Sequence, residues 1–294
     1  MGDREGVAPH PDPLPVAVVD NHTHLDIRRR DVADAIAPEG GDERTTQDVA
    51  AALATAASVG VDRVVQVGCD LESARFTVDQ VDRHPTMLGA VALHPNEIPA
   101  LAEAGRLHEA WDEIEQLSAH PRVRAIGETG LDYFRTGPDG HAVQQESFRW
   151  HIDLAKRTGK ALQIHDRDSH DDILRILAEE GAPETTVLHC FSGDLAMARE
   201  CVERGYHLSF AGTVTFKSAA GLREALAHTP LEQVLAETDA PYLTPTPERG
   251  RANAPYLLPH TVRVMARTLG VDVPTMCSAI SANSERVYGS WQTS

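Results

Sequence analysis

Eight short runs rich in Val, Ile and Leu recur along this 294-residue chain, and they constrain its fold more than any other feature. Runs of this length and composition are typical of strands that are buried on both faces of a parallel sheet. The segments between the runs carry apolar residues at helical spacing. The predicted strands are 16–22, 62–68, 87–93, 123–128, 161–165, 185–189, 206–212 and 233–239.

Helical segments separate these strands, and three of them end on a glycine, a residue favoured just after a helix C-terminus. The three segments are 45–60, 144–159 and 194–205, and the stretch 259–288 predicts one or two more helices. Eight strands that alternate with helices predict an α/β fold, a (β/α)₈ barrel of the TIM type. A doubly wound open sheet is the alternative, but no Gly-x-Gly-x-x-Gly follows the first strand.

The barrel accounts for most of the chain as a single domain. We expect it to span 16–288, after a flexible lead-in at 1–15 and before a short C-terminal tail at 289–294. The longest loops are expected at 26–44 and 132–143, after the first and fourth strands. Both follow the carboxyl ends of strands, where a barrel enzyme keeps its active site, so we expect them to face the substrate.

Charge and cysteine content limit the partners and the compartment. The chain has 27 Lys and Arg against 44 Asp and Glu, a formal net charge of −17, which argues against a broad basic surface that coats nucleic acid. A small basic patch that grips one phosphate stays possible. The four cysteines show no Cys-x-x-Cys spacing and the N-terminus lacks signal-peptide features, so we expect a cytoplasmic protein with no membrane association.

The run VVDNHTHL at 18–25 places two histidines behind an apolar strand. Because successive side chains on a strand point to opposite faces, His22 and His24 point the same way. Two imidazoles that converge on one face can bind a metal ion. A histidine pair of this kind is also compatible with an ordinary buried position, so the rest of the chain has to decide.

Further imidazoles and carboxylates stand at the carboxyl ends of other predicted strands. The set comprises Glu128, His165, His189 and Asp239. Mixed imidazole and carboxylate ligands suit Zn²⁺ or Mn²⁺ better than an all-oxygen calcium site. Four histidines and two carboxylates exceed what one tetrahedral ion with an open position uses. Two ions that share Glu128 as a bridge fit better, with Asp239 and Glu128 as the expected catalytic carboxylates.

Other polar residues near these strand ends have more than one interpretation. His94 precedes Pro95 and either contacts the substrate or caps its strand, and Asp132 either holds its loop or orients a neighbouring ligand. Arg249 and Arg251 follow the last strand, and Arg167 follows the fifth. Guanidinium groups at the mouth of a metal site predict phosphate binding and an anionic substrate. The alternative is an exposed loop with solvated charges.

Seven ordered segments resemble the TatD family of metal-dependent hydrolases and deoxyribonucleases. They are DNHTHLD, ALHPNE, AIGETGLDY, QIHDRD, LHCFSG, LAETDAPYL and RGRANAP, and the resemblance runs from about residue 18 to residue 288. It implies a TIM-like barrel and a site for two divalent metal ions, with Mg²⁺ or Mn²⁺ common in the family. By motif, His22, His24, Glu128 and Asp239 would hold one ion, and Glu128, His165 and His189 the other. The chain departs from the usual Asn-Glu-Pro at Asn253-Ala254-Pro255.

The resemblance predicts phosphodiester hydrolysis by a metal-activated water, with 3′→5′ exonuclease action on single-stranded DNA ends. Two divalent ions per subunit (Mg²⁺, Mn²⁺ or Zn²⁺), DNA as the substrate, no obligate protein partner and a monomeric state are expected. One alternative is an amidohydrolase or lactonase, but many of those bridge their metals with a carboxylated lysine where this chain has Glu128. The other is a non-catalytic binding barrel that a metal ion stabilises.

Overall fold

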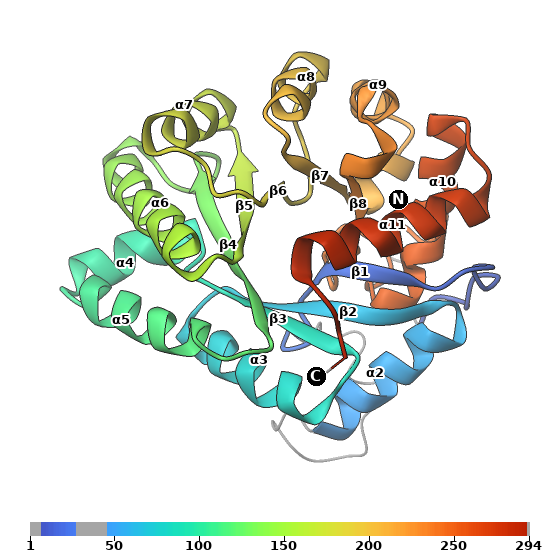
Figure 1. The fold of residues 1–294 in the computed structure, drawn as a ribbon, viewed down its shortest axis with the longest axis horizontal. Helices are drawn as coiled ribbons and strands as arrows, with labels where there is room; N and C mark the ends of the chain where they lie inside the picture. Colours follow the sequence, from blue (N-terminus) through green and yellow to red (C-terminus); the bar gives the residue numbers. More distant parts are fainter. Residues whose placement is uncertain (1–6, 28–45, 293–294) are drawn as a thin grey trace.

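The strands of this protein form one eight-stranded parallel sheet in which each strand pairs with the next along the chain (Figure 1). The structure is a computed structural model that describes residues 7–27 and 46–292. Every predicted strand is present. The strands are β1 (Val18–Thr23), β2 (Val61–Gly68), β3 (Met87–Val91), β4 (Val123–Asp132), β5 (Ala161–Arg167), β6 (Thr186–Leu188), β7 (His207–Phe210) and β8 (Val234–Ala236).

The sheet curls until its first and last strands meet, which confirms the predicted barrel. Thr23 and Ala240 form a parallel bridge, and the His24 N–H donates to the Ala240 carbonyl at 2.9 Å. The Asp239 N–H in turn donates to the His22 carbonyl at 2.9 Å. These backbone contacts hold the carboxyl end of β1 beside the chain that leaves β8, so their side chains share one rim of the barrel.

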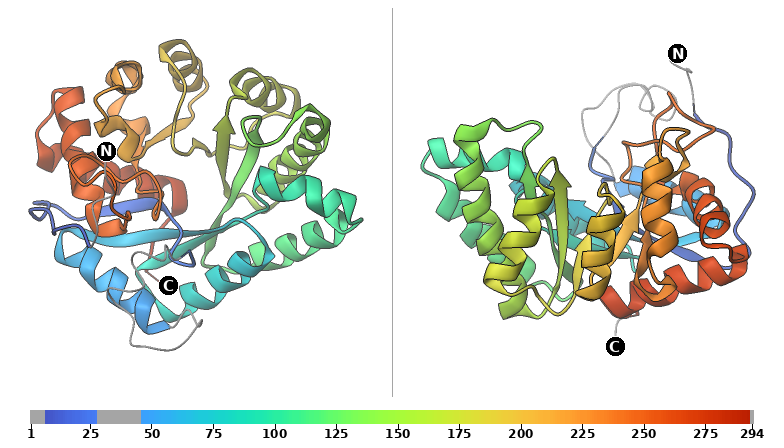
Figure 2. Two further views of the ribbon diagram at one scale, coloured as in Figure 1. Left: turned by 180° about the vertical axis from the view of Figure 1, so that it is seen from behind. Right: turned by 90° about the horizontal axis from the view of Figure 1, so that it is seen from above.

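Helices surround the strands on the outside of the barrel, as both views in Figure 2 show. They are α2 (Thr46–Ser58), α3 (Leu71–Arg83), α4 (Ile98–Glu103), α5 (Leu107–Ser118), α6 (Pro138–Thr158), α7 (His170–Glu180), α8 (Leu195–Glu203), α9 (Ala220–His228), α10 (Leu258–Leu269) and α11 (Val273–Tyr288). Short 3₁₀ turns lie at η1 (Pro95–Glu97), η2 (Gly212–Thr215), η3 (Leu231–Gln233) and η4 (Pro255–Leu257). Among the described residues, no helix has both the length and the apolar character needed to cross a membrane.

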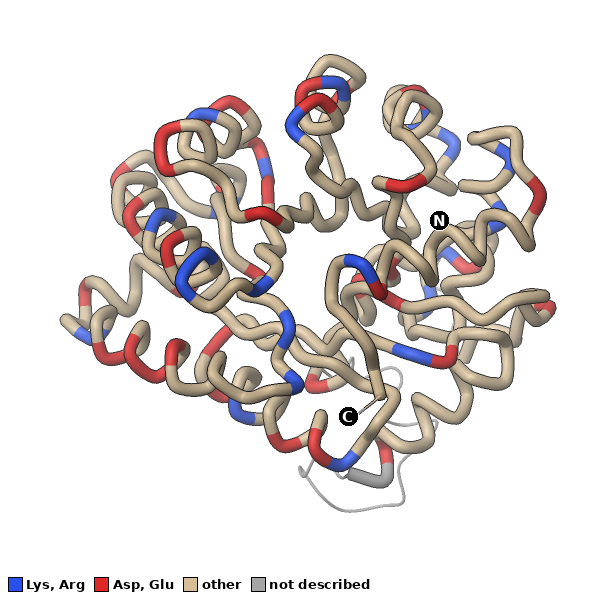
Figure 3. Tube along the Cα trace, in the orientation of Figure 1, with Lys and Arg blue, Asp and Glu red and all other residues tan. Residues whose placement is uncertain are grey.

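Side-chain burial explains why the strands occupy the centre. All six residues of β1 and all five of β3 are buried, and apolar side chains from the helices pack around the sheet. Figure 3 shows that the charged residues gather on the surrounding helices and that the strands carry few of them. Burial of the apolar strands against the helices is the main force that holds such a barrel together.

Gly130 allows strands β4 and β5 to approach closely near their carboxyl ends. Its φ angle is +139°, and a Cβ atom at this position would lie 2.0 Å from the His165 carbonyl oxygen. Only glycine fits such a backbone. The close approach places Glu128 on β4 next to His165 on β5.

One of the two predicted long loops differs from the structure. The loop expected at 132–143 is only five residues long, because β4 runs to Asp132 and α6 begins at Pro138, where a helix tolerates proline. The other long loop, at 26–44, lies mostly outside the described residues.

The lead-in predicted to be flexible is docked from residue 7 onwards. The Tyr256 hydroxyl donates to the Ala8 carbonyl at 2.8 Å, and the Leu14 N–H donates to the Val59 carbonyl at 3.0 Å. Ala8 and Leu14 are buried. These contacts come from residues far along the chain, so local composition gives no sign of them.

Candidate metal centre

The two histidines of β1 converge as the strand alternation predicts. Their Nε2 atoms lie 3.2 Å apart, and both side chains are buried at the carboxyl end of the barrel. The Nδ1 atom of His24 lies 3.0 Å from the Val67 carbonyl on the neighbouring strand. This contact leaves Nε2 of His24 directed toward the same space as Nε2 of His22.

Glu128 stands at the centre of the cluster and faces imidazoles on two sides. Its Oε2 atom lies 3.4 Å from His22 Nε2 and 3.8 Å from His24 Nε2. Its Oε1 atom lies 2.6 Å from His165 Nδ1 and 2.9 Å from His189 Nε2. One carboxylate thus lies between two histidine pairs, each close enough to share a metal ion with it.

Asp239 completes the first group from the other side of the barrel seam. Its Oδ1 atom lies 3.4 Å from His24 Nε2 and 3.9 Å from His22 Nε2. Its φ angle of +52° places the residue in the left-handed region, which aspartate adopts more readily than most residues. The structure therefore brings together all six residues that the sequence predicts as metal ligands.

The electrostatics of the cluster fit a bound divalent cation. Burial lowers the pKa of His22 to about 3, so this imidazole is neutral at pH 7 and can donate its lone pair. Burial alone would raise the pKa of Glu128, but the charges of His189 and His94 hold it well below its usual value. Burial lowers the pKa of His24, but the Asp239 carboxylate outweighs it and raises this pKa to about 9, and Glu128 likewise raises the pKa of His189. These two rings would therefore release protons when a metal ion binds, since only a neutral imidazole is a ligand.

Two buried nitrogen atoms in the cluster lack hydrogen-bond partners within the described residues. They are His22 Nδ1 and His165 Nε2. The second of these lies 3.3 Å from the Asp132 carboxylate, a distance that allows an ion pair when the imidazole is protonated. Buried polar atoms of native proteins are normally paired, so a cluster with unpaired atoms and excess ligands indicates that a further group binds here.

Two residues with more than one interpretation lie beside the cluster. His94 caps η1 through a hydrogen bond from the Asn96 N–H to its Nδ1 atom at 3.1 Å, and its Nε2 atom lies 3.5 Å from Glu128. Asp132 is buried and accepts a hydrogen bond from the Asn96 side chain at 3.0 Å. Both residues contact predicted metal ligands, and this placement is compatible with the orienting role expected of Asp132.

Glu237 is the main site residue that the sequence reasoning missed. It is fully buried on the chain that leaves β8, and its Oε1 atom lies 3.0 Å from His189 Nδ1. The same oxygen accepts a hydrogen bond from the Cys190 N–H at 2.8 Å. The signal was present in the sequence, because Glu237 precedes Asp239 by two residues, the same spacing as the two histidines of β1.

The contacts of the three arginines predicted to bind phosphate lie outside the cluster of metal ligands. Arg249 is exposed and its guanidinium lies over the Phe216 ring at 3.7 Å, and exposed Arg167 lies over Phe134 at 4.0 Å. Arg251 donates to the Val7 carbonyl at 2.8 Å and lies 3.2 Å from Glu248. Arg251 therefore anchors the N-terminal segment, and phosphate binding by the three arginines stays a prediction.

Comparisons with known proteins agree on one family. The model of the family described as TatD related DNase matches residues 19–289. A Mycobacterium tuberculosis protein described as an uncharacterized metal-dependent hydrolase, TatD, is 48% identical over 276 residues, covering 92% of this chain and 98% of that protein. The Escherichia coli metal-dependent hydrolase YcfH is 34% identical over 276 residues, covering 92% and 95%.

Solved structures agree with the sequence relatives. YJJV, a TatD homologue from Escherichia coli, superposes with a TM-score of 0.80 at 25% identity and covers 93% of this chain and 98% of its own. A TatD family hydrolase from Entamoeba histolytica shares the fold with a TM-score of 0.78. With its barrel, its cluster of imidazoles and carboxylates and these relatives, the chain belongs to the TatD family of metal-dependent hydrolases.

Proposed function

We propose that this hydrolase is a deoxyribonuclease that removes nucleotides from the 3′ ends of single-stranded DNA. The observation that carries the proposal is the position of Glu128 between two histidine pairs. A carboxylate shared by two ions is the arrangement that clamps both the attacking and the leaving oxygen of a phosphodiester. The family description, TatD related DNase, supports the same reaction.

Two divalent ions, Mg²⁺, Mn²⁺ or Zn²⁺, would occupy the cluster. One would be held by His22, His24, Glu128 and Asp239, and the other by Glu128, His165 and His189. When bound, such ions polarise the phosphate and lower the pKa of a coordinated water. The first set groups the two histidines at the end of β1 with the chain that leaves β8, and the second groups His165 on β5 with His189, which follows β6.

Asp239 is the carboxylate best placed to handle the proton of the attacking water. Its side chain is 14% exposed, against 6% for Glu128, so it borders the open side of the cluster. A general base must lie within hydrogen-bond reach of the water it deprotonates. Arg249 is exposed on the loop after β8 and can bind a non-bridging phosphate oxygen once it leaves Phe216.

The residue at the bridging position favours a nuclease over an amidohydrolase with a carboxylated lysine. Glu128 occupies this position on β4, and Lys156, the next lysine in the chain, lies exposed on α6. The net charge of −17 disfavours long duplex DNA, because phosphate repulsion grows with the length of the bound segment. We therefore propose short single strands as the substrates. We also propose that the enzyme acts as a monomer.

A time course on a 5′-labelled single-stranded oligonucleotide tests the proposal, with Mg²⁺, Mn²⁺ or Zn²⁺ added and EDTA as the blank. We expect a ladder that shortens from the 3′ end and depends on metal. The Glu128→Gln protein should be at least about 10³-fold slower, because it loses the shared ligand and its charge. Circular dichroism checks that this variant is folded.

The opposite outcome is equally clear. An oligonucleotide that stays intact with every metal, in a preparation shown to contain bound metal, would exclude the deoxyribonuclease proposal. Cleavage that persists in the folded Glu128→Gln protein would assign the activity to a contaminant or to other residues.

A further inference from the structure

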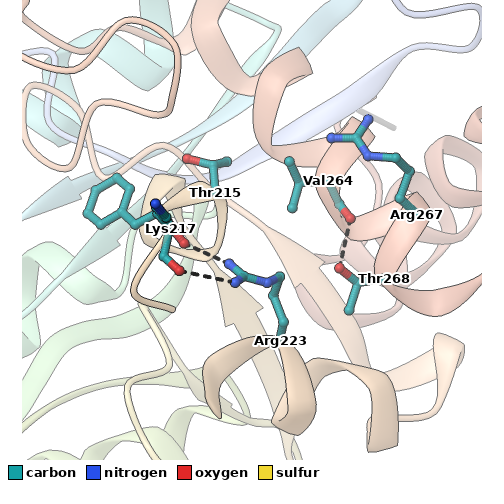
Figure 4. A pocket seen from close by; sticks show the side chains of 7 residues that line it. Thr215, Lys217, Arg223, Val264, Arg267 and Thr268 are labelled. Carbon is teal, nitrogen blue, oxygen red and sulfur yellow. Dashed lines mark hydrogen bonds between the residues drawn. The ribbon is translucent and has the colours of Figure 1, made fainter. Parts of the chain in front are cut away.

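A wide, open pocket lies outside the metal cluster, between η2, α9 and α10 (Figure 4). Its volume is about 390 Å³. Three of its lining residues are cationic, namely Lys217, Arg223 and Arg267, and none is acidic. Such a pocket is notable in a chain with a net charge of −17, because it creates a local positive potential on an acidic body.

The three cations have different tasks. The Arg223 guanidinium donates to the Val214 carbonyl at 3.0 Å and to the Phe216 carbonyl at 2.7 Å, so it fixes η2 as one wall. Lys217 and Arg267 are exposed, and within the described residues no hydrogen bond or ion pair engages their side-chain nitrogen atoms. These two cations are therefore available to an anion.

The pocket adjoins the loop that leaves the metal cluster. The Thr246 N–H donates to Thr215 Oγ1 at 2.8 Å, which ties this loop to η2. On the same loop, Arg249 lies over the ring of Phe216, which lines the pocket. Asp239 begins the loop, so one chain segment leads from the metal cluster to the wall of the pocket.

We propose that this pocket binds a backbone phosphate of single-stranded nucleic acid, away from the scissile bond. Lys217 and Arg267 neutralise the phosphate, and the ring of Phe216 beside them can stack on a base once Arg249 has moved off it to the phosphate at the cluster. Proteins that bind single strands combine a cationic groove with aromatic side chains in this way. The inference rests on the proposed nuclease function, which it deepens by adding a second contact along the strand.

The double variant Lys217→Gln/Arg267→Gln tests the pocket and leaves Arg223 in place to support η2. We expect the KM for a 12-nucleotide single strand to rise about tenfold, with kcat unchanged, because the changes lie outside the cluster. The salt dependence of binding should weaken by about one unit of log–log slope. Hydrolysis of bis(p-nitrophenyl) phosphate, which has a single phosphate, should stay at the wild-type rate.

A control variant removes two cations on the other side of the barrel. Arg106→Gln/Lys156→Gln changes the net charge equally on exposed positions near α5 and on α6. We expect its KM for the 12-mer to stay within about twofold of wild type. An equal loss of affinity in both double variants would contradict the proposed phosphate site, because it would show that the change in net charge alone explains the effect.

Fluorescence anisotropy of the labelled 12-mer in EDTA measures binding of the strand without hydrolysis, so it tests the phosphate site separately from the nuclease reaction. If the wild-type protein cuts the 12-mer and the Lys217→Gln/Arg267→Gln variant binds it as tightly as the wild type, the phosphate site is contradicted and the nuclease function is supported. If the double variant binds the 12-mer more weakly than the wild type but the wild type cuts no phosphodiester, the phosphate site is supported and the nuclease function is contradicted.

Discussion

A buried guanidinium precedes strand β4 and a buried carboxylate lies in the second half of the strand, and the two charged groups are paired in opposite ways. Just before the strand, the Arg122 guanidinium donates to four backbone carbonyls at 2.7–3.2 Å. These carbonyls belong to Val81, Pro85, Met87 and Trp291. In the second half of the strand, Glu128 faces the imidazoles of five histidines at 2.6–3.8 Å, more than the roughly four hydrogen bonds that a carboxylate accepts.

The difference separates a structural end of the barrel from a chemical one. Each donor that Arg122 directs inward has an acceptor, so this end gains stability and needs no further group. In the cluster around Glu128, by contrast, two buried imidazole nitrogen atoms, His22 Nδ1 and His165 Nε2, have no hydrogen-bond partner among the described residues. In barrel enzymes, polar residues at the carboxyl ends of the strands serve catalysis and those at the opposite end serve stability.

The largest expected effect on stability comes from the structural end. Arg122→Met should lower the free energy of unfolding by about 3–5 kcal/mol, because several buried carbonyls lose their donor. Urea denaturation at pH 7 measures this loss. The folded fraction should keep the wild-type rate of hydrolysis, since the change lies at the opposite end from the cluster.

Arg75→Met provides the matched control for this prediction. Arg75 is exposed and pairs with Glu113 on the surface, and exposed ion pairs contribute little to stability. We expect the control to unfold at the wild-type urea concentration. If Arg122→Met also unfolded at the wild-type urea concentration, the four contacts of Arg122 with carbonyls would make no net contribution to the free energy of unfolding. The distinction between a structural and a chemical end of the barrel would then be contradicted.

His151 is a buried histidine outside the cluster, and it can be compared with the buried histidines of the cluster. His151 is fully buried, its Nδ1 atom contacts the Ser147 carbonyl at 2.8 Å, and its Nε2 atom accepts from the Leu93 N–H at 3.2 Å. Both ring nitrogens are thus paired with backbone in the neutral form. Burial lowers the pKa of His151 from 6.5 to about 4.

This lowered pKa predicts a specific dependence of stability on pH. Between pH 6.5 and 4 the unfolded chain binds a proton at His151 that the folded protein does not bind, so the folded state loses stability as the pH falls. The loss attributable to this residue is about 3 kcal/mol by pH 4. The stability is fully present above pH 6.5.

The variant His151→Gln isolates this contribution, because glutamine keeps an acceptor and does not titrate. The wild type should be the more stable protein at pH 7, and its advantage should shrink steadily down to pH 4 in urea titrations. Parallel curves for the two proteins would show that His151 does not titrate between folded and unfolded states. Titration of other groups is common to both proteins and cancels in the difference.

The positions of the strands and of six cluster residues could be predicted, because both follow from local patterns. Buried strands form apolar runs, and polar residues at the ends of such runs are conspicuous. The start of α6 was missed because Pro138, Asp139 and Gly140 are common in turns, although proline is also favoured at the first helical position, which Pro138 occupies. Glycine is required at 140 because a Cβ there would lie 2.4 Å from the Thr136 side chain, a contact that the linear pattern does not show.

Contacts distant in sequence explain what local composition could not show. The docking of residues 7–15 depends on Tyr256, Arg251 and Arg263, about 240–250 positions later in the chain. The sequence neighbours of Arg251 gave no sign that its guanidinium donates to the Val7 carbonyl, and its role in phosphate binding stays a prediction. A linear pattern cannot show which distant carbonyl will occupy a cationic side chain.

Glu237 was missed although the alternation rule applied to it, and it gives the smallest expected effect. Its carboxylate lies behind His189, at 3.0 Å from Nδ1, and so directs Nε2 of this ring toward Glu128. A carboxylate in this position raises the basicity of a ligating imidazole.

Glu237→Gln keeps an acceptor for the Cys190 N–H but removes the charge, so Mn²⁺ affinity measured by titration calorimetry should fall about tenfold. Glu232→Gln, an exposed change two residues before β8 begins, should leave the Mn²⁺ affinity unchanged. A folded Glu237→Gln protein with wild-type Mn²⁺ affinity would place Glu237 with Arg122, among the buried charges that serve structure alone.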